Sequence, residues 1–370
     1  MSRFLQQLSA EERRQLERYQ FDRETFERLR ERFVTGGWTT AQNRVEGAVE
    51  MPHDGDILTL PPVGSDERER LEELGRGALE AGEVGALVLN GGMATRFGSV
   101  VKGCVEVFEG VSFLGIKLAD AARWNAPVLL MNSFATDDKT DEHLEEFGHF
   151  GFSRNRLLTF SQSVSLRLTP EGEIFGLGTG ETLYAPGHGD VAQSVRRHAL
   201  DRFRAMGGKY LLMSNVDNVL ASLDPAVIGF HIDQAARDGV QVTIEAVDNQ
   251  GSTTGGMPAR VDGKLQVVEA FRFPHHFDPS SIPVYNTNTF LFSADALDRT
   301  FDLTWFVVEK EVNGEKAVQF ERLAGELSAF LNTQFLQVPR AGRHSRFLPI
   351  KRREDLRNSR GFLKTAVDWL

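Results

Sequence analysis

A glycine-rich loop with two cations close behind it is the part of this chain best suited to binding phosphate. The apolar run at residues 85–89 leads directly into residues 90–92 (Asn-Gly-Gly), and Arg96 and Lys102 follow. Glycine lets the backbone approach a ligand closely, and consecutive free amides can form a concave site for an anion. The two cations would add charge against a phosphate group. We expect the loop to bind a phosphorylated ligand; a tight turn with incidental cations is the alternative.

Two common nucleotide-binding patterns are absent from this loop. No Gly-Lys-Ser or Gly-Lys-Thr follows it, which excludes a P-loop of the Walker A type. Its glycines, Gly91, Gly92 and Gly98, also lack the spacing of the dinucleotide-binding fingerprint. A dinucleotide-dependent oxidoreductase is therefore disfavoured.

A carboxylate and a basic segment are further candidates for phosphate chemistry. Asp217 follows the apolar run at residues 210–213, and a carboxylate at the end of a strand can hold Mg²⁺ between phosphates. The alternative is a structural turn stabilised by the side chains of residues 215–218. Residues 340–360 contain eight Lys or Arg and two acids, although the whole chain has a net charge of −10. This basic segment would serve a phosphate-rich ligand or form a solvated surface strip.

The composition narrows the class of protein. The 370 residues are 41% hydrophobic and 25% charged, as in ordinary globular proteins. Residues 1–16 contain no apolar run that would make a signal peptide, and no apolar stretch is long enough to span a bilayer. Cys104 is the single cysteine, which excludes an intrachain disulfide and fits a reducing compartment. The acidic net charge argues against general nucleic-acid binding. We expect a cytoplasmic protein without nucleic-acid or membrane partners.

The patterns along the chain predict an N-terminal helical segment at residues 1–80. Apolar residues recur at helical spacing over residues 1–35, and Ser9 with Glu12 would form a capping box. A second helix is predicted at residues 65–81, and residues 38–64, which contain several prolines and glycines, read as irregular. We expect this segment to pack on the core rather than to move freely.

Alternating short apolar runs and helical patterns fill the predicted catalytic domain at residues 81–355, with a short tail at residues 356–370. Strands are predicted at residues 85–89, 127–131, 157–160, 210–213, 240–246 and 289–292. Helices fit between several of them, such as residues 191–206 before a pair of glycines. This alternation predicts an α/β fold with a mostly parallel, Rossmann-like sheet, which binds ligands at the carboxyl ends of its strands.

Six segments in a fixed order resemble the UDP-sugar pyrophosphorylase family, which includes UDP-glucose and UDP-N-acetylglucosamine pyrophosphorylases. They are residues 89–98 with the following Val101 and Lys102, 160–162 (Phe-Ser-Gln), 186–190 (Pro-Gly-His-Gly-Asp), 214–218 (Ser-Asn-Val-Asp-Asn), 285–288 (Tyr-Asn-Thr-Asn) and 345–351 (Ser-Arg-Phe-Leu-Pro-Ile-Lys). The resemblance covers residues 60–355 and implies a fold of the nucleotidyltransferase type.

The resemblance also implies roles for the charged residues. Lys102 matches the family's catalytic lysine, and Arg96 resembles the arginine that holds the leaving pyrophosphate. Lys351 matches a C-terminal lysine that reaches the phosphates, and Asp217 matches the metal site, which implies Mg²⁺ as cofactor. A surface lysine and a structural turn are the alternatives for Lys351 and Asp217.

For the substrates, the resemblance implies a set of binding residues from five of the six segments, together with two residues that lie between segments. The glutamine would read the uracil edge, the histidine motif would lie along the nucleotide, and the amides and the glutamate would line the sugar pocket. These residues are Asn90, Gly91, Gly92, Met93, Gln162, Gly187, His188, Asn215, Gly256, Glu269 and Asn286. A structural histidine and a plain surface acid are the alternatives for His188 and Glu269.

The activity implied is the conversion of UTP and glucose 1-phosphate to UDP-glucose and pyrophosphate. The alternatives are a UDP-N-acetylglucosamine pyrophosphorylase and, in a different class, a catalytically silent nucleotide-sugar sensor. Some segments depart from the family pattern: Ala94 replaces a usual glycine, and Arg96 stands where eukaryotic UDP-glucose enzymes have serine. Either Arg340 or Arg343 could match the family's arginine before the last segment.

Overall fold

A mixed eight-stranded sheet forms the centre of the computed structural model, which describes residues 3–94, 100–108, 110–251 and 254–367. Every neighbouring pair is parallel except the two pairs that include β16. The strand order is β2 (Ile57–Thr59), β19 (Thr333–Gln337), β13 (Val242–Asp248), β16 (Val284–Ser293), β12 (Tyr210–Asn215), β3 (Val84–Leu89), β8 (Val128–Asn132) and β9 (Leu157–Ser161). All six predicted strands and the mostly parallel α/β sheet are confirmed.

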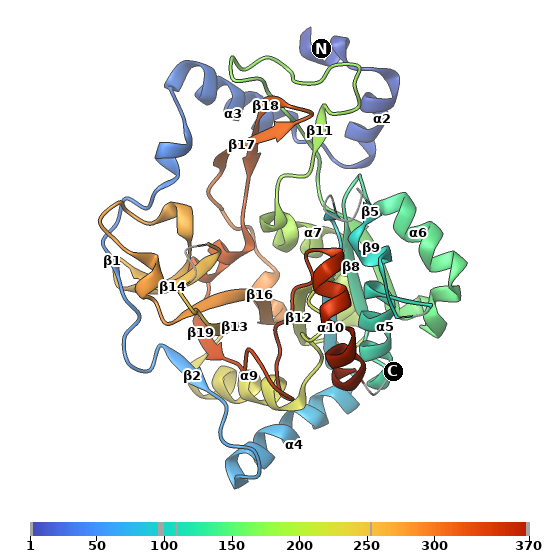
Figure 1. The fold of residues 1–370 in the computed structure, drawn as a ribbon, viewed down its shortest axis with the longest axis vertical. Coiled ribbons are helices and arrows are strands. Elements are labelled where there is room, and N and C mark those ends of the chain that lie inside the picture. The colour runs from blue at the N-terminus through green and yellow to red at the C-terminus, as the bar shows by residue number, and fades with distance from the viewer. Residues whose placement is uncertain (1–2, 95–99, 109, 252–253, 368–370) are drawn as a thin grey trace.

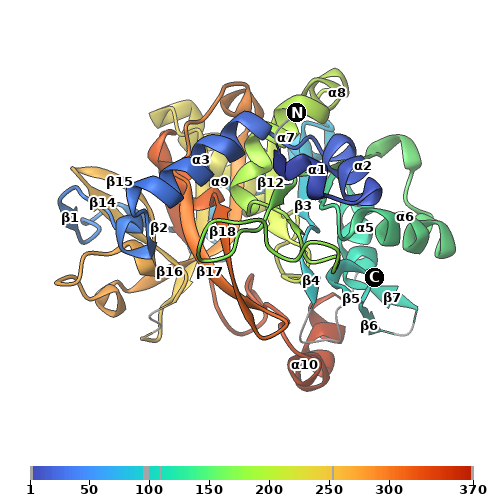
Figure 2. The ribbon, with the colours of Figure 1, turned by 90° about the horizontal axis from the view of Figure 1, so that it is seen from above.

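The central strands are apolar throughout because both faces of the sheet are covered. In β3, Ala86 and Val88 join one hydrophobic core, whereas Leu87 and Leu89 join the other. The first core includes α4 (Asp66–Glu80), α5 (Phe113–Arg123), α9 (Pro225–Asp238) and α10 (Arg353–Ala366); the second includes α7 (Val191–His198) and α8 (Leu200–Ala205). Figure 2 shows α8 and α10 on opposite sides of the molecule. A sheet covered on both faces is typical of parallel α/β folds.

Two of the covering helices touch through glycines. A Cβ on Gly75 of α4 would lie 1.9 Å from the carbonyl oxygen of Pro225, and one on Gly229 of α9 would lie 1.8 Å from that of Leu71. Any side chain at either position would force the helices apart. This close contact lets α4 and α9 lie side by side, as Figure 1 shows, and both contribute to the first core.

The N-terminal helices pack on a hydrophobic core of their own. Helices α1 (Arg3–Gln7), α2 (Ala10–Arg18) and α3 (Arg23–Gly36) replace the continuous pattern predicted for residues 1–35, and the capping box of Ser9 and Glu12 is confirmed. Their apolar residues meet those of two hairpins, β10 (Ser165–Leu166) with β11 (Leu183–Tyr184) and β17 (Phe306–Val312) with β18 (Glu315–Glu321). Phe320, for example, stacks on Trp38. The apolar residues of the N-terminal helices are thus buried against these hairpins.

The prediction that residues 38–64 are irregular is only partly right, because this region contains two short strands. Strand β1 (Val49–Glu50) pairs with β14 (Gly256–Val261), which in turn pairs with β15 (Lys264–Glu269), and β2 forms one edge of the central sheet. Both strands are too short to show an alternating pattern, and their pairing partners lie about 200 residues or more away in the chain.

The other elements are short or lie at the edges of the fold. They are β4 (Met93–Ala94), β5 (Val100–Val101), β6 (Glu106–Phe108), β7 (Val111–Ser112) and α6 (Asp137–Glu146). The predicted helix at residues 191–206 is divided into α7 and α8 at Ala199, whose backbone is not helical. Residues 353–366 form α10, which buries Leu356 and Leu363. None of the helices in the described part of the chain has the length and apolar character needed to span a bilayer.

Candidate active site

One cavity of about 810 Å³ brings together most of the residues predicted for phosphate, base and sugar binding. It lies where β3, β9 and β12 end, at the carboxyl edge expected for an α/β sheet. The predicted residues that line it are Gly91, Gly92, Lys102, Gln162, Gly187, His188, Asn215, Asp217, Asn286 and Lys351. Residues from six segments far apart in the chain thus share one hollow of the size of a nucleotide-sugar site.

Asn90 is hydrogen-bonded to β8 and α6 and does not line the cavity. It is fully buried at the end of β3, and its Nδ2 donates to Oδ1 of Asn132 at 2.8 Å and to Oγ1 of Thr140 at 2.9 Å. Met93 is not among the lining residues either; it pairs with Val101 in the β4–β5 ladder, directly before Lys102. Arg96 lies outside the described residues.

Gln162 presents a buried side-chain amide to the cavity. It follows β9, is 5% exposed, and its Oε1 has no hydrogen-bond partner among the described residues. A Cβ on Gly91 would lie 2.4 Å from Nε2 of Gln162, so the glycine makes room for the amide. A buried carbonyl oxygen without a partner costs free energy, and a ligand N–H in the cavity would supply the missing donor.

His188 is held as a neutral hydrogen-bond donor. Its Nδ1 accepts from the backbone N–H of Ala324 at 2.9 Å, which leaves the proton of the neutral ring on Nε2. Desolvation lowers the pKa of His188 to about 4. Gly187 before it has φ +85°, and a Cβ there would lie 2.4 Å from the carbonyl oxygen of Arg322. The motif therefore needs its first glycine for both backbone conformation and space.

Lys102 and Asp217 contact each other inside the cavity. Nζ of Lys102 donates to Oδ2 of Asp217, and the aspartate is 5% exposed. Lys351 is exposed at the cavity wall, and the preceding Ile350 donates its N–H to the carbonyl oxygen of Asp217 at 3.4 Å. The two predicted lysines and the predicted metal ligand thus line the same cavity.

The segment that carries Lys351 is attached to the Asp217 loop by Asn218. The side chain of Asn218 donates to the carbonyl oxygen of Arg346 at 3.2 Å and accepts from the N–H of Leu348 at 3.0 Å. These two hydrogen bonds make residues 345–351 follow the loop that contains the carboxylate.

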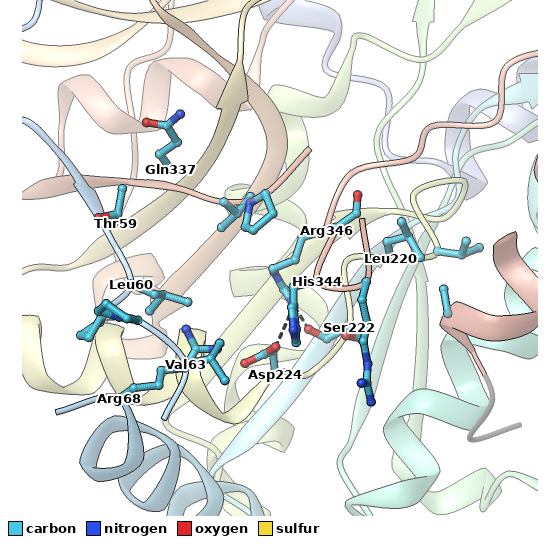
Figure 3. Close-up of a pocket in the computed structure, with 18 of the residues that line it drawn as sticks. Thr59, Leu60, Val63, Arg68, Leu220, Ser222, Asp224, Gln337, His344 and Arg346 are labelled. Atoms are coloured by element: carbon cyan, nitrogen blue, oxygen red, sulfur yellow. Dashed lines mark hydrogen bonds and ion pairs between the residues drawn. The ribbon is translucent and has the colours of Figure 1, made fainter. Parts of the chain in front are cut away.

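Arg346 attaches the same segment to the rest of the fold. It lines a second cavity of about 530 Å³ (Figure 3). Its guanidinium donates twice to Oε1 of Glu245, at 2.9 and 2.6 Å, and once to the carbonyl oxygen of Ser222 at 3.0 Å. Asp224 lies 3.6 Å away and faces it in Figure 3. Sequence reasoning did not identify Glu245, although an acid within an apolar strand was a visible signal.

Arg340 and Arg343, either of which could match the family's arginine, make different contacts. Arg340 donates to the carbonyl oxygen of Asp248 at 2.6 Å and covers the ring of Tyr285, which lines the candidate active site. Arg343 lines the second cavity instead.

The expected sugar end of the site is only partly lined by the predicted residues. Asn215 and Asn286 line the cavity, and both are oriented by Asn288: its Nδ2 donates to Oδ1 of Asn215 at 3.0 Å, and its N–H donates to Oδ1 of Asn286 at 2.8 Å. Gly256 and Glu269 face each other across the β14–β15 ladder, just beyond the lining residue Gly255. Burial raises the pKa of Glu269 to about 7.

Several lining residues were not predicted as site residues, and most of them flank the predicted motifs. They are Leu89, Met131, Ala185, Val216, Thr254, Gly255, Tyr285, Thr287, Asn288, Phe347 and Pro349. Tyr285, Thr287 and Asn288 lie within or beside a segment already matched to the family, so the segment was the available signal.

The residues around Asp217 suit a magnesium ion delivered with a nucleotide. No group of three or more His, Cys, Asp or Glu residues that could hold a metal occurs in the described parts of the chain. Mg²⁺ is commonly held by one or two carboxylates together with substrate phosphates and water. One carboxylate at the wall of a cavity large enough for a nucleotide fits that mode of binding.

Comparisons with known proteins agree with the site. A family model for UTP–glucose-1-phosphate uridylyltransferase matches residues 24–363. The proteins of that name from Pyrus pyrifolia and Solanum tuberosum are both 30% identical to this chain, over 93% and 90% of it and 74% and 70% of their own length. A UDP-glucose pyrophosphorylase variant from Leishmania major, solved with UDP-glucose, has a TM-score of 0.71 at 20% identity, over 96% of this chain and 78% of its own.

The fold is shared with a second branch of sugar-nucleotide enzymes. The UDP-N-acetylglucosamine pyrophosphorylase from Trypanosoma brucei has a TM-score of 0.70 at 19% identity, over 94% of this chain and 80% of its own. The structural likeness therefore shows the fold and does not separate the two sugars. The family match over most of the chain and the 30% identical relatives show that the protein belongs to the UTP–glucose-1-phosphate uridylyltransferase family.

Proposed function

We propose that this protein is a uridylyltransferase that converts UTP and glucose 1-phosphate to UDP-glucose and pyrophosphate. The observation that carries the proposal is the buried Oε1 of Gln162, which has no hydrogen-bond partner among the described residues and belongs to the lining of the candidate active site. The N3–H of uracil is a donor that would satisfy this acceptor, whereas cytosine has no hydrogen at that position. The family assignment supports the same reaction.

The reaction suits a site built from cations and backbone amides. A phosphate oxygen of glucose 1-phosphate attacks the α-phosphorus of UTP, and the bond to the bridging oxygen of the β-phosphate breaks as pyrophosphate leaves. The attacking phosphate is already ionised at neutral pH, so the step requires no protein base. Both substrates are polyanions, and catalysis therefore depends on positioning and on neutralising charge.

The residues of the cavity divide this work. Gly91 and Gly92 leave backbone space for the triphosphate, and Lys102 and Lys351 place ammonium groups beside it. The neutral His188 offers an Nε2–H that stays a donor throughout the physiological pH range. We assign Mg²⁺ to Asp217; when bound, the ion would neutralise phosphate charge.

Glucose 1-phosphate is the preferred sugar substrate because the matching family model and the 30% identical relatives carry its name. N-acetylglucosamine 1-phosphate is the second candidate, since that branch has the same fold. A silent nucleotide-sugar sensor would not need Lys102, Asp217 and Lys351 together in one cavity. We further propose a cytoplasmic location, without membrane or nucleic-acid partners, from the single cysteine and the acidic net charge.

The direct test measures pyrophosphate release from UTP with Mg²⁺ and a panel of sugar 1-phosphates. We expect glucose 1-phosphate to give the highest kcat/KM. A higher value with N-acetylglucosamine 1-phosphate would move the protein to the other branch, and no release with any sugar would favour the sensor.

The base assignment has its own test. Gln162→Ala leaves uracil without its partner, which costs about 1–3 kcal/mol. We expect KM for UTP to rise and the preference for UTP over CTP to fall, with KM for glucose 1-phosphate nearly unchanged. An unchanged preference for UTP would show that the base is read by other residues.

A further inference from the structure

We propose that Asp190 is a positioning residue that sets uracil specificity by fixing Gln162 and His188 relative to each other. The inference rests on the proposed function, because it concerns the same nucleotide. Asp190 is 2% exposed and is not among the residues that line the candidate active site. Its effect must therefore pass through the residues that it contacts.

One oxygen of the carboxylate fixes the chain directly after Gln162. Oδ2 of Asp190 accepts from the N–H of Ser163 at 2.7 Å, from Oγ of Ser163 at 2.8 Å and from Oγ of Ser194 at 3.1 Å. The N–H of Gln162 itself donates to the carbonyl oxygen of Asn132 at 3.0 Å. The backbone is thus held on both sides of the base-reading side chain.

The other oxygen fixes the turn that contains His188. Oδ1 of Asp190 accepts from a guanidinium nitrogen of Arg322 at 2.6 Å. The backbone of Arg322 donates to Pro186 at 2.8 Å and accepts from Gly189 at 2.9 Å, so it contacts the turn on both sides of His188. The nearby N–H of Ala324 then orients the imidazole through Nδ1.

The contacts of Asp190 therefore join two segments that approach the nucleotide from different directions. Gln162 extends from the end of β9, whereas His188 begins η6 (His188–Asp190), the short turn before α7. The base and the phosphates belong to one covalently linked substrate that both segments must position for reaction, and a shift of about 1 Å in either segment would disturb that geometry. Fixing this distance is a specificity function that the two binding residues do not perform themselves.

The chemistry of the contacts requires a carboxylate. Ser163 and Arg322 both direct N–H groups at Asp190, and an ionised carboxylate accepts hydrogen bonds through both oxygens. An asparagine would keep one acceptor but would direct its own N–H₂ at a donor. It would also leave the largely buried guanidinium of Arg322 without its countercharge. Asp190→Asn therefore disturbs the position of both segments with little change in volume.

The test is steady-state kinetics of Asp190→Asn with each substrate varied separately. We expect KM for UTP to rise at least tenfold and the preference for UTP over CTP to fall by a similar factor, while KM for glucose 1-phosphate stays within threefold. Asp298→Asn is the matched control, because Asp298 also pairs with arginines, Arg196 and Arg204, but is exposed. Its kinetics should equal those of the wild type.

A second variant separates positioning from folding. Asp190→Asn combined with Arg322→Met removes the uncompensated charge, so we expect its thermal midpoint to recover relative to the single variant while base selectivity stays low. If either folded variant keeps the wild-type preference for UTP over CTP, the proposal is overturned.

Equilibrium binding distinguishes failure of this inference from failure of the proposed function. Titration calorimetry gives the Kd ratio of UTP to CTP even for a chain that turns over no sugar phosphate. A wild type that binds UTP selectively without turnover would contradict the proposed reaction alone. A selectivity that Asp190→Asn leaves intact would contradict the role of Asp190 alone.

Discussion

Lys102 and Asp217 form an ion pair between two loops of the candidate active site, with Nζ of the lysine donating to Oδ2 of the aspartate. Lys102 follows the glycine loop after β3, and Asp217 lies two residues after β12, the strand that pairs with β3. The side chain of Asp217 is 7% exposed, and the ammonium of Lys102 contacts its carboxylate directly. A cation that binds Asp217 must compete with Lys102.

This competition predicts the effect of Lys102 on metal affinity. We expect Lys102→Met to bind Mn²⁺, a probe for Mg²⁺, about tenfold more tightly than the wild type in the absence of nucleotide, a change of about 1.4 kcal/mol. Electron paramagnetic resonance of free Mn²⁺ measures the affinity. Asp217→Asn is the control and should bind the ion more weakly than either. Equal affinity in wild type and Lys102→Met would show that the ion binds elsewhere.

Turnover should change in the opposite direction in the same variant. If Lys102 stabilises charge that builds up on the α-phosphate, its loss lowers kcat more than it raises KM. The expected cost is about 3–4 kcal/mol, roughly a hundred- to a thousand-fold in rate. Lys102→Ala and Lys102→Met should behave alike because the effect needs the ammonium. A kcat within about threefold of the wild type would remove Lys102 from the mechanism.

The strands and motifs could be read from the sequence because their signals are local. β9 and β12 are short apolar runs with parallel neighbours, and Gln162 and Asp217 follow them, whereas His188 follows the antiparallel β10–β11 hairpin and was indicated by the family resemblance alone. Since parallel strands place their carboxyl ends at one edge, the local pattern was enough to gather Gln162 and Asp217 in one cavity.

The contacts that orient these residues depend on pairings across the chain, which no local pattern contains. Lys102 and Asp217 are 115 positions apart, and Asp190 and Arg322 are 132 apart. The hydrogen bonds of the Asn90 side chain to Asn132 and Thr140 likewise reach residues 42 and 50 positions away. The short β2 was missed for the same reason, because its pairing with β19 spans most of the chain.

His188 predicts a defined loss of stability in acid. Its pKa is about 4 in the folded protein, against about 6.5 for an unfolded histidine. The neutral ring is favoured by folding, so its contribution is complete above pH 6.5 and is lost as the pH falls towards 4. We expect the thermal midpoint of the wild type to fall across this window.

The variant His188→Asn tests whether protonation of His188 causes this loss of stability. Its side-chain oxygen can accept from the N–H of Ala324 in place of Nδ1, and it does not titrate. The decline of the thermal midpoint between pH 6.5 and 4 should be shallower in the variant. His231, whose pKa burial lowers to about 3, contributes to the decline in both proteins and so cancels in the comparison. Parallel curves would mean that His188 is already exposed to solvent.

The buried pair of Glu245 and Arg346 predicts a change in both stability and catalysis. Glu245 is 1% exposed and Arg346 is 5% exposed, and the segment that Arg346 belongs to carries Lys351. Glu245→Gln leaves the guanidinium buried without its nearest countercharge, since Asp224 is 3.6 Å away. Removing one member of a buried pair typically costs about 3–5 kcal/mol. Chemical denaturation should show a loss of that order.

A double variant shows whether the pair also positions Lys351. Glu245→Gln with Arg346→Met removes both charges, and such replacements often restore stability. The Met side chain, however, cannot donate to Ser222, so residues 345–351 lose one attachment to the loop that contains Asp217. We therefore expect the double variant to regain most of its stability and to keep a kcat reduced by about tenfold or more. Recovery of kcat together with stability would show that Arg346 serves folding alone, because Asn218 would then suffice to hold Lys351 beside Asp217.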